Sequence, residues 1–214
     1  MSLFYYLETF LAKLVLCLVT RWEVRGKENV STDGPLVIAS NHLSIADPPV
    51  LAASIQRRVV FMAKVESFRH PVQGPLVRGF GAFPVRRGQV DREALRWAQR
   101  TLKSGLALGM FPEGARSLTA KLQEGRPGTA LVALRGGAPI LPVAVTGTER
   151  VRGIGFIFAR VPITVNIGQP FVLPPVDGKL TREQLAKATK VIMGRIAELL
   201  PAGYRDEHGD QEGR

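Results

Sequence analysis

The sequence has a single cysteine, Cys17, among its 214 residues. One cysteine excludes an internal disulfide, so no covalent cross-link can stabilise the fold. Histidine is also scarce. With three histidines, no HExxH motif and no clustered Cys and His, the sequence predicts no metal site. A Gly-x-Ser-x-Gly elbow is missing too, and Ser44 is the only serine inside the block Asn41 to Asp47. A hydrolase with a serine nucleophile is therefore not indicated.

A hydrophobic run long enough to cross a bilayer is also lacking. Residues 3–19 are nearly all apolar but include Glu8, Thr9 and Lys13. A helix of that length is about 25 Å long, short of the roughly 30 Å hydrocarbon core. One helical face collects Leu3, Phe4, Leu7, Phe10, Leu11, Leu14, Val15 and Leu18. We predict that segment 1–22 forms an amphipathic helix in the membrane interface, without a signal peptide. The alternative is a helix packed on the chain's own core.

Acidic residues are outnumbered by basic ones. Lys and Arg total 29 against 18 Asp and Glu, which gives a net charge of +11. This excess predicts an anionic partner such as lipid headgroups, a phosphorylated substrate, an acidic carrier or nucleic acid. No recognition helix or aromatic-interleaved basic sheet supports nucleic acid, and we predict none. A non-catalytic basic membrane-binding module remains an alternative.

Short apolar runs alternate with amphipathic segments over residues 23–203. The predicted strands lie at 22–26, 35–39, 59–63, 82–85, 106–111, 140–146 and 161–167, and the predicted helices at 49–55, 91–103, 128–134 and 181–200. This alternation predicts an α/β domain with a mixed, mostly parallel sheet flanked by helices. Residues 71–81, rich in Pro and Gly, predict a loop that shapes a site wall. Pro142 predicts an edge or bulged position, and residues 204–214 a disordered tail.

The stretch 40–49 carries the most informative residues. His42 follows the predicted strand 35–39, and Asp47, before Pro48, is predicted to be a helix N-cap. A strand–turn–helix lets Asp47 reach an imidazole nitrogen, whereas residues five apart on one helix point about 140° away from each other. A carboxylate there orients the ring and stabilises the imidazolium. The pattern indicates a general base without a nucleophile. The alternative is a capping aspartate beside an unrelated histidine.

Charged side chains follow other predicted strands. They are Lys64, Arg86 with Arg87, and Glu113 with Arg116, and Arg126 adds further charge. In open α/β sheets, functional residues gather beyond the carboxyl ends of the strands. The guanidinium fork suits phosphate. A base together with several cations suggests a phosphorylated substrate that carries a hydroxyl group.

Two motifs together resemble those of the glycerophospholipid acyltransferases, of the 1-acyl-glycerol-3-phosphate acyltransferase type. They are Asn41-His42-x4-Asp47 and Phe111-Pro112-Glu113-Gly114-Ala115-Arg116-Ser117. Two weaker blocks, Gly81 to Arg87 and Ile140 to Val145, stand in the family's order. The resemblance covers about residues 24 to 175. Ala115 departs from the threonine common in the family, a change that packing should tolerate.

The resemblance implies transfer of a fatty acyl group to the sn-2 hydroxyl of 1-acyl-sn-glycerol-3-phosphate, giving phosphatidic acid. The donor would be an acyl-CoA or acyl-ACP thioester, with no other cofactor. His42 would be the base, oriented by Asp47, and no acyl-enzyme would form. The implied substrate-binding residues are Lys64, Arg86, Glu113, Gly114, Arg116 and Ser117. Another lyso-lipid or glycerol 3-phosphate stays open as acceptor. We expect a peripheral or monotopic protein on an anionic cell membrane, on its cytoplasmic face.

Overall fold

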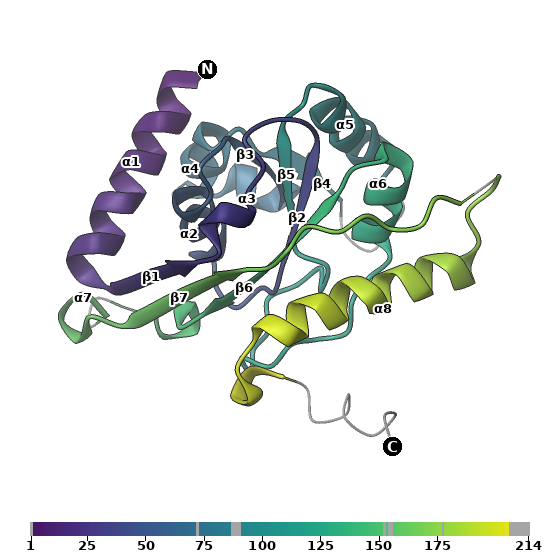
Figure 1. Cartoon of the computed structure of the whole chain (residues 1–214). Helices are drawn as coiled ribbons and strands as arrows, with labels where there is room; N and C mark the ends of the chain where they lie inside the picture. Colours follow the sequence, from purple (N-terminus) through teal and green to yellow (C-terminus); the bar gives the residue numbers. More distant parts are fainter. Residues whose placement is uncertain are drawn as a thin grey trace.

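A seven-stranded sheet forms the centre of the protein (Figure 1). The computed structural model describes residues 2–71, 73–86, 91–151, 153, 156–176 and 178–205. The strands are β1 (Arg21–Arg25), β2 (Leu36–Ser40), β3 (Val59–Lys64), β4 (Phe83–Val85), β5 (Ala107–Met110), β6 (Ile140–Thr146) and β7 (Pro162–Ile167). Their order is β1-β7-β6-β2-β5-β3-β4. The β6–β7 pair is antiparallel and the other pairs are parallel, which confirms the predicted mixed, mostly parallel sheet.

Helices cover both faces of this sheet. One face carries α1 (Ser2–Val19) and α2 (Asp47–Ser54), and the other α5 (Arg92–Lys103), α6 (Gly128–Gly136) and α8 (Arg182–Leu199) (Figure 1). Alternate residues of β2 enter the two cores: Leu36 and Ile38 pack toward α1 and α2, and Val37 and Ala39 toward the other helices. Every residue of β2 is buried, as expected for a parallel strand covered on both sides.

Helix starts follow the local sequence. Asp91 caps α5 by accepting the N–H groups of Glu93 and Ala94, and Thr181 forms a capping box with Gln184 at the start of α8. The shorter helices are α3 (Val65–Arg69), α4 (Gln73–Gly79), α7 (Phe156–Ala159), and the 3-10 turns η1 (Lys27–Asn29), η2 (Thr148–Arg150) and η3 (Ala202–Tyr204).

Helix α4 replaces most of the loop that the sequence predicts at 71–81, so that prediction is wrong. Pro75 is the third residue of α4, and N–H groups in the first turn lack intrahelical acceptors, so a proline there breaks no bond. Gly74 allows α4 to approach α3, because a Cβ at this position would lie 2.7 Å from the carbonyl oxygen of Phe68.

Pro142 lies in β6, an interior strand between β7 and β2, which excludes the edge, one of the two positions predicted for it. The ladder between β6 and β7 runs from Val143 to Thr146 on the β6 side. Pro142 precedes this ladder, and its carbonyl accepts the N–H of Gly168 beyond the end of β7. Pro142 still pairs with Ala39 of β2. The N–H that proline lacks therefore falls at the end of the β6–β7 ladder and not within it.

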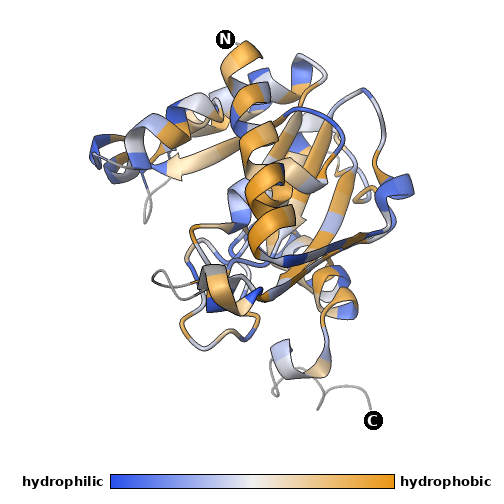
Figure 2. Cartoon of the chain, turned by 90° about the vertical axis from the view of Figure 1, so that its left-hand side faces the viewer, coloured by the Kyte–Doolittle hydropathy of each residue, from blue (hydrophilic) through white to orange (hydrophobic). Residues whose placement is uncertain are grey.

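Helix α1 packs on the domain and also presents an apolar surface to the outside (Figure 2). Tyr5 and Leu16 are buried, and the Tyr5 hydroxyl accepts the N–H of Val59 at 3.0 Å. All eight residues of the predicted apolar face are exposed, by 45 to 78%. The helix thus packs on the chain's own core on one side, as the second alternative predicted, and leaves the predicted apolar face exposed on the other. In the described part of the chain, no helix has the length and apolar character needed to span a membrane.

The predicted C-terminal tail begins inside the folded part. Tyr204 ends η3, donates its hydroxyl to Glu149 at 2.7 Å, and accepts the N–H of Leu122. The rest of the predicted tail, residues 206–214, lies outside the described residues.

Candidate active site

The carboxyl ends of β2, β5 and β6 meet at one edge of the sheet, because these strands are parallel. The chain leaves β2 through Asn41 and His42, and leaves β5 through Phe111. Asn41 ties the first of these exits to β6, since its amide donates to the carbonyl of Val145 at 2.8 Å and accepts the N–H of Val145 at 2.7 Å. Residues far apart in the sequence are thereby held at one place.

The His42 imidazole lies against the Asp47 carboxylate. Nδ1 of His42 is 2.8 Å from Oδ2 of Asp47, and both side chains are buried. The ring also stacks on Phe111, with centroids 4.0 Å apart and an interplanar angle of 18°. With Nδ1 occupied and no described residue hydrogen-bonded to Nε2, the second nitrogen is the one available to a substrate.

Asp47 is not the N-cap of α2, as the sequence predicts, but its first residue; Ala46 takes the N-cap position. Its carboxylate turns back to the preceding loop, where Oδ2 also accepts the N–H groups of Leu43 at 2.6 Å and Ser44 at 2.8 Å. The aspartate therefore folds the loop that carries His42. These donors compensate the desolvation of a carboxylate that is 0% exposed.

Sequence reasoning missed Thr148, which contacts the same carboxylate. Its hydroxyl donates to Oδ1 of Asp47 at 2.5 Å. The signal in the sequence was weak: a Gly-Thr pair directly after the predicted strand 140–146. Nothing in that pair alone points toward a residue 101 positions earlier.

Glu113 supports His42 through the backbone. Its Oε1 accepts the N–H of His42 at 2.7 Å, and Oε2 accepts the N–H of Gln123 at 3.1 Å. Burial raises the pKa of the Glu113 carboxyl to about 7; the two N–H donors act against this rise, and the nearby Asp47 charge adds to it. Glu113 forms no ion pair with a basic side chain of the described residues. It therefore positions the His42 loop, whereas the resemblance implied a residue that binds the substrate.

Ser117 closes the loop from the β5 side. Its N–H donates to the carbonyl of His42 at 2.7 Å, so the segment 113–117 and the His42 loop are bound at two points. Gly114 is in the left-handed region with φ +71°, and a Cβ there would lie 2.7 Å from Cδ of Arg126. Glycine thus lets the Arg126 side chain lie directly against the segment that carries Glu113.

The predicted basic residues lie at the same edge but differ in their distance from His42. Arg116, inside the segment bound to His42, is exposed and makes no hydrogen bond or ion pair with any described residue. Lys64 ends β3 and pairs with Glu66 at 3.5 Å. Arg86 follows β4, three strands from β2, roughly 14 Å away at the usual strand spacing. Arg87 lies outside the described residues.

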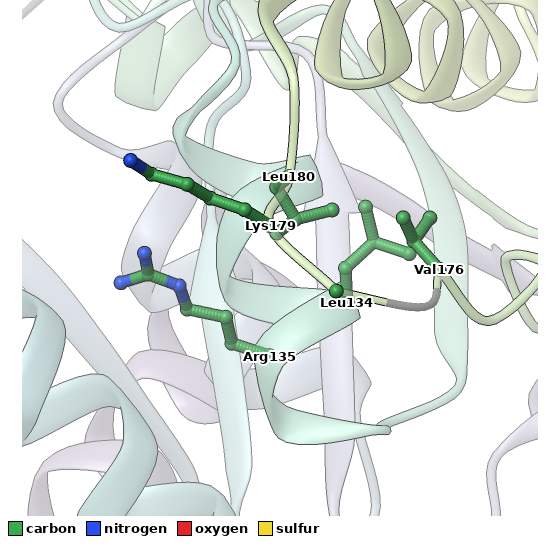
Figure 3. A pocket seen from close by; sticks show the side chains of 6 residues that line it. Leu134, Arg135, Val176, Lys179 and Leu180 are labelled. Carbon is green, nitrogen blue, oxygen red and sulfur yellow. The ribbon is translucent and has the colours of Figure 1, made fainter.

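A separate hollow of about 390 Å³ lies beside α6 (Figure 3). Its lining consists of Leu134, Arg135, Val176, Gly178, Lys179 and Leu180, and it includes none of the residues described around His42. In the same described ranges, no group of three or more His, Cys, Asp or Glu side chains could hold a metal ion. The chemistry available around His42 is that of an oriented imidazole with cations nearby.

Comparison with known proteins agrees with this geometry. A family model described as Acyltransferase matches residues 21–146, more than half of the chain. The chain therefore belongs to the acyltransferase family, which confirms the resemblance drawn from its motifs.

Individual relatives are similarly named. The chain is 29% identical over 188 residues to the 1-acyl-sn-glycerol-3-phosphate acyltransferase of Bacillus subtilis (strain 168), covering 87% of this chain and 92% of that one. It is 32% identical over 138 residues to the chloroplastic enzyme BAT2 of Brassica napus, covering 62% and 39%. The crystal structure of the 1-acyl-sn-glycerophosphate (LPA) acyltransferase PlsC from Thermotoga maritima has a TM-score of 0.70 and 26% identity, covering 91% of this chain and 79% of that one.

Proposed function

We propose that this chain transfers a fatty acyl group from a thioester, acyl-CoA or acyl-ACP, to the sn-2 hydroxyl of 1-acyl-sn-glycerol-3-phosphate and so forms phosphatidic acid. The acceptor follows from the names of the relatives. The base follows from the contact of 2.8 Å between Nδ1 of His42 and Oδ2 of Asp47, which is the observation that carries the proposal. The reaction requires no cofactor besides the thioester.

The proposed step is direct transfer. The acceptor hydroxyl attacks the thioester carbonyl carbon while its proton passes to Nε2 of His42. Asp47 stabilises the imidazolium. The C–S bond then breaks, and the leaving thiolate takes the proton back from His42, which leaves an ester and a free thiol. Direct attack is favoured because no described Ser or Cys side chain hydrogen-bonds to His42.

Cations at the site edge would bind the acceptor phosphate. Arg116 leads this set because its segment is bound to the His42 loop and its guanidinium has no partner among the described residues. Arg126, lying against Gly114, adds charge beside it. Lys64, at the end of β3, and Arg86, after β4, lie on strands farther from β2 and would contact the phosphate less directly.

The exposed face of α1 would hold the enzyme on a membrane. β1 follows α1 and begins at Arg21, which pairs with Pro162; the neighbouring Thr164 of β7 opposes Thr146 at the carboxyl end of β6. The end of α1 thus lies at the edge of the sheet that carries His42. Its apolar stripe and the net charge of +11 both favour an anionic lipid surface. The cytoplasmic face follows if the donor is a soluble cytoplasmic thioester.

The test is an acyl-transfer assay of the whole chain on anionic vesicles. The acceptors are lysophosphatidic acid, glycerol 3-phosphate and other lyso-phospholipids, each with acyl-CoA and with acyl-ACP. We expect phosphatidic acid as the main product, and a loss of turnover of about 10² or more in His42→Ala. A folded His42→Ala protein with normal turnover would disprove the base. Vesicle binding with no transfer to any acceptor would favour a non-catalytic membrane module.

A further inference from the structure

The Asp47 carboxylate receives its donors unevenly. Oδ2 accepts three hydrogen bonds, all from the residues 42–44 just before it. Oδ1 accepts one, from the hydroxyl of Thr148. Asp47 and Thr148 are each 0% exposed, so bulk water does not reach either side chain. Among the described residues, the Thr148 hydroxyl is therefore the one hydrogen-bond donor to Oδ1 of the buried Asp47 carboxylate.

The backbone holds Thr148 in place. Gly147, at the end of β6, has φ +89°, and a Cβ there would collide with the carbonyl oxygen of Pro162. The turn therefore requires glycine. It leads into η2, whose bonds from Arg150 N–H to the Gly147 carbonyl and from Val151 N–H to the Thr148 carbonyl order the next residues. The backbone of Thr148 is thus fixed by ordered residues on both sides, at the edge of the sheet.

The consequence concerns the orientation of the carboxylate. Donors on one oxygen alone leave the plane of a carboxylate free to turn about that contact, whereas a donor on each oxygen defines the plane. Without the Thr148 hydroxyl, Oδ1 would be a buried acceptor without a partner, and the group would rotate or admit water to satisfy it. Either change moves Oδ2 relative to Nδ1 of His42.

We propose that Thr148 is a positioning residue for the general base, which acts through Asp47 and touches no substrate. This inference rests on the proposed role of His42. Thr148 lies two residues beyond the stretch 21–146 that the family model matches, and it joins the last strand of that stretch to the catalytic loop. Its function is to fix the direction of the His42–Asp47 contact.

The test compares three single variants by steady-state kinetics on vesicles. Thr148→Val keeps the shape and removes the donor, and Thr148→Ser keeps the hydroxyl. Thr101→Val is the control, because Thr101 is also buried but donates only to the Trp97 carbonyl within α5. We expect Thr148→Val to lower kcat about tenfold with KM of both substrates nearly unchanged. Thr148→Ser should restore most of kcat, and the control should match the wild type.

A double-mutant cycle separates positioning from a merely structural role. If Thr148 acts through Asp47, then Thr148→Val should add little loss in an Asp47→Asn background. The proton on Nδ1 of His42, observed by NMR, should also shift in Thr148→Val but not in Thr101→Val. Should Thr148→Val not fold, Thr148→Ala takes its place in the same cycle.

Three results would overturn the inference: normal kcat in a folded variant without the hydroxyl, an undiminished loss in the Asp47→Asn background, or no recovery in Thr148→Ser. Failure of the proposed function looks different. In that case His42→Ala itself retains activity, or the wild type transfers no acyl group at all.

Discussion

At the scale of single residues, Asp47 makes more contacts within the site than the orientation of His42 alone requires. It binds the ring of His42, two N–H groups of its own loop and a hydroxyl from the end of β6. A single carboxylate thus orients the His42 ring and folds the loop that carries it. Loss of activity and loss of stability should therefore be separable by the choice of substitution.

Two substitutions at Asp47 test this separation. Asp47→Asn keeps the shape but removes the charge that stabilises the imidazolium, so turnover should fall strongly with a smaller effect on stability. Asp47→Ala leaves buried donors without an acceptor and should cost about 3 kcal/mol, more than the roughly 1 kcal/mol of a lost N-cap. Urea unfolding and kcat are measured for both. Equal stability of wild type and Asp47→Ala would contradict the hydrogen-bond network.

Glu113 gives a pH dependence of stability. Burial raises the pKa of this carboxyl from 4.5 to about 7, so between these values the folded state keeps a proton that the unfolded state has released. The free energy of unfolding should therefore fall as the pH rises through this window, by roughly 3 kcal/mol in total. Glu113→Gln lacks this titration. Urea unfolding from pH 4.5 to 8 should show the wild type losing stability relative to the variant, and parallel curves would refute the raised pKa.

Arg116 tests the binding of the acceptor phosphate. Arg116→Lys keeps the charge but loses the planar fork, and should raise KM for the acceptor several-fold with little change in KM for the donor. Arg86→Lys is the matched comparison, since Arg86 lies three strands from β2. A larger acceptor effect at Arg86 would reverse the assignment, and an effect on the donor alone would place Arg116 at the carrier.

At the scale of elements, much of the chain could be predicted from its sequence. Periodicity located the strands and the main helices, since buried strands and capped amphipathic helices carry local signals. The loop predicted at 71–81 and the edge position predicted for Pro142 were wrong for one physical reason. Pro75 lies in the first turn of α4, where N–H groups lack intrahelical acceptors, and Pro142 lies at the end of the β6–β7 ladder. Neither proline interrupts the middle of a hydrogen-bonded element, and the composition of the segment does not show this.

The candidate site could be predicted only in part, because some of its contacts join residues far apart in the sequence. His42 and Asp47 are five residues apart, so their contact depends on one local turn. The contacts of Glu113 with the His42 backbone and of Thr148 with Asp47 join residues 71 and 101 positions apart. They depend on the strand order β6-β2-β5, which no single segment encodes.

Helix α1 yields a prediction at this scale. Leu11→Glu should weaken vesicle binding, measured by flotation, because it places a charge mid-way along the apolar stripe. Its stability should stay within about 0.5 kcal/mol of wild type, since the side chain is 48% exposed. Val191→Glu is the control, an apolar side chain of α8 that is 43% exposed on the opposite face. Equal loss in both variants would mean that charge alone governs binding.

At the scale of the whole molecule, the sheet separates two surfaces. The face with α1 and α2 bears the apolar stripe, and α7 packs against α1 with Phe158 exposed beside it. The face with α5, α6 and α8 lies away from that stripe (Figure 1). A membrane held by α1 would leave this second face to the aqueous phase, from which a soluble thioester donor arrives.

The attachment of α1 through Tyr5 and Leu16 has a kinetic consequence. Because the helix is packed on the domain, it cannot act as a loose tether. If α1 holds the protein on a membrane as proposed, His42 would keep a constant height above the lipid surface. Under this proposal the protein would meet its acceptor by lateral diffusion in two dimensions. Its rate should follow the mole fraction of lysophosphatidic acid in the vesicle, and dilution with inert lipid at constant bulk acceptor concentration should slow it. A rate set by the bulk concentration alone would mean that the acceptor arrives through water.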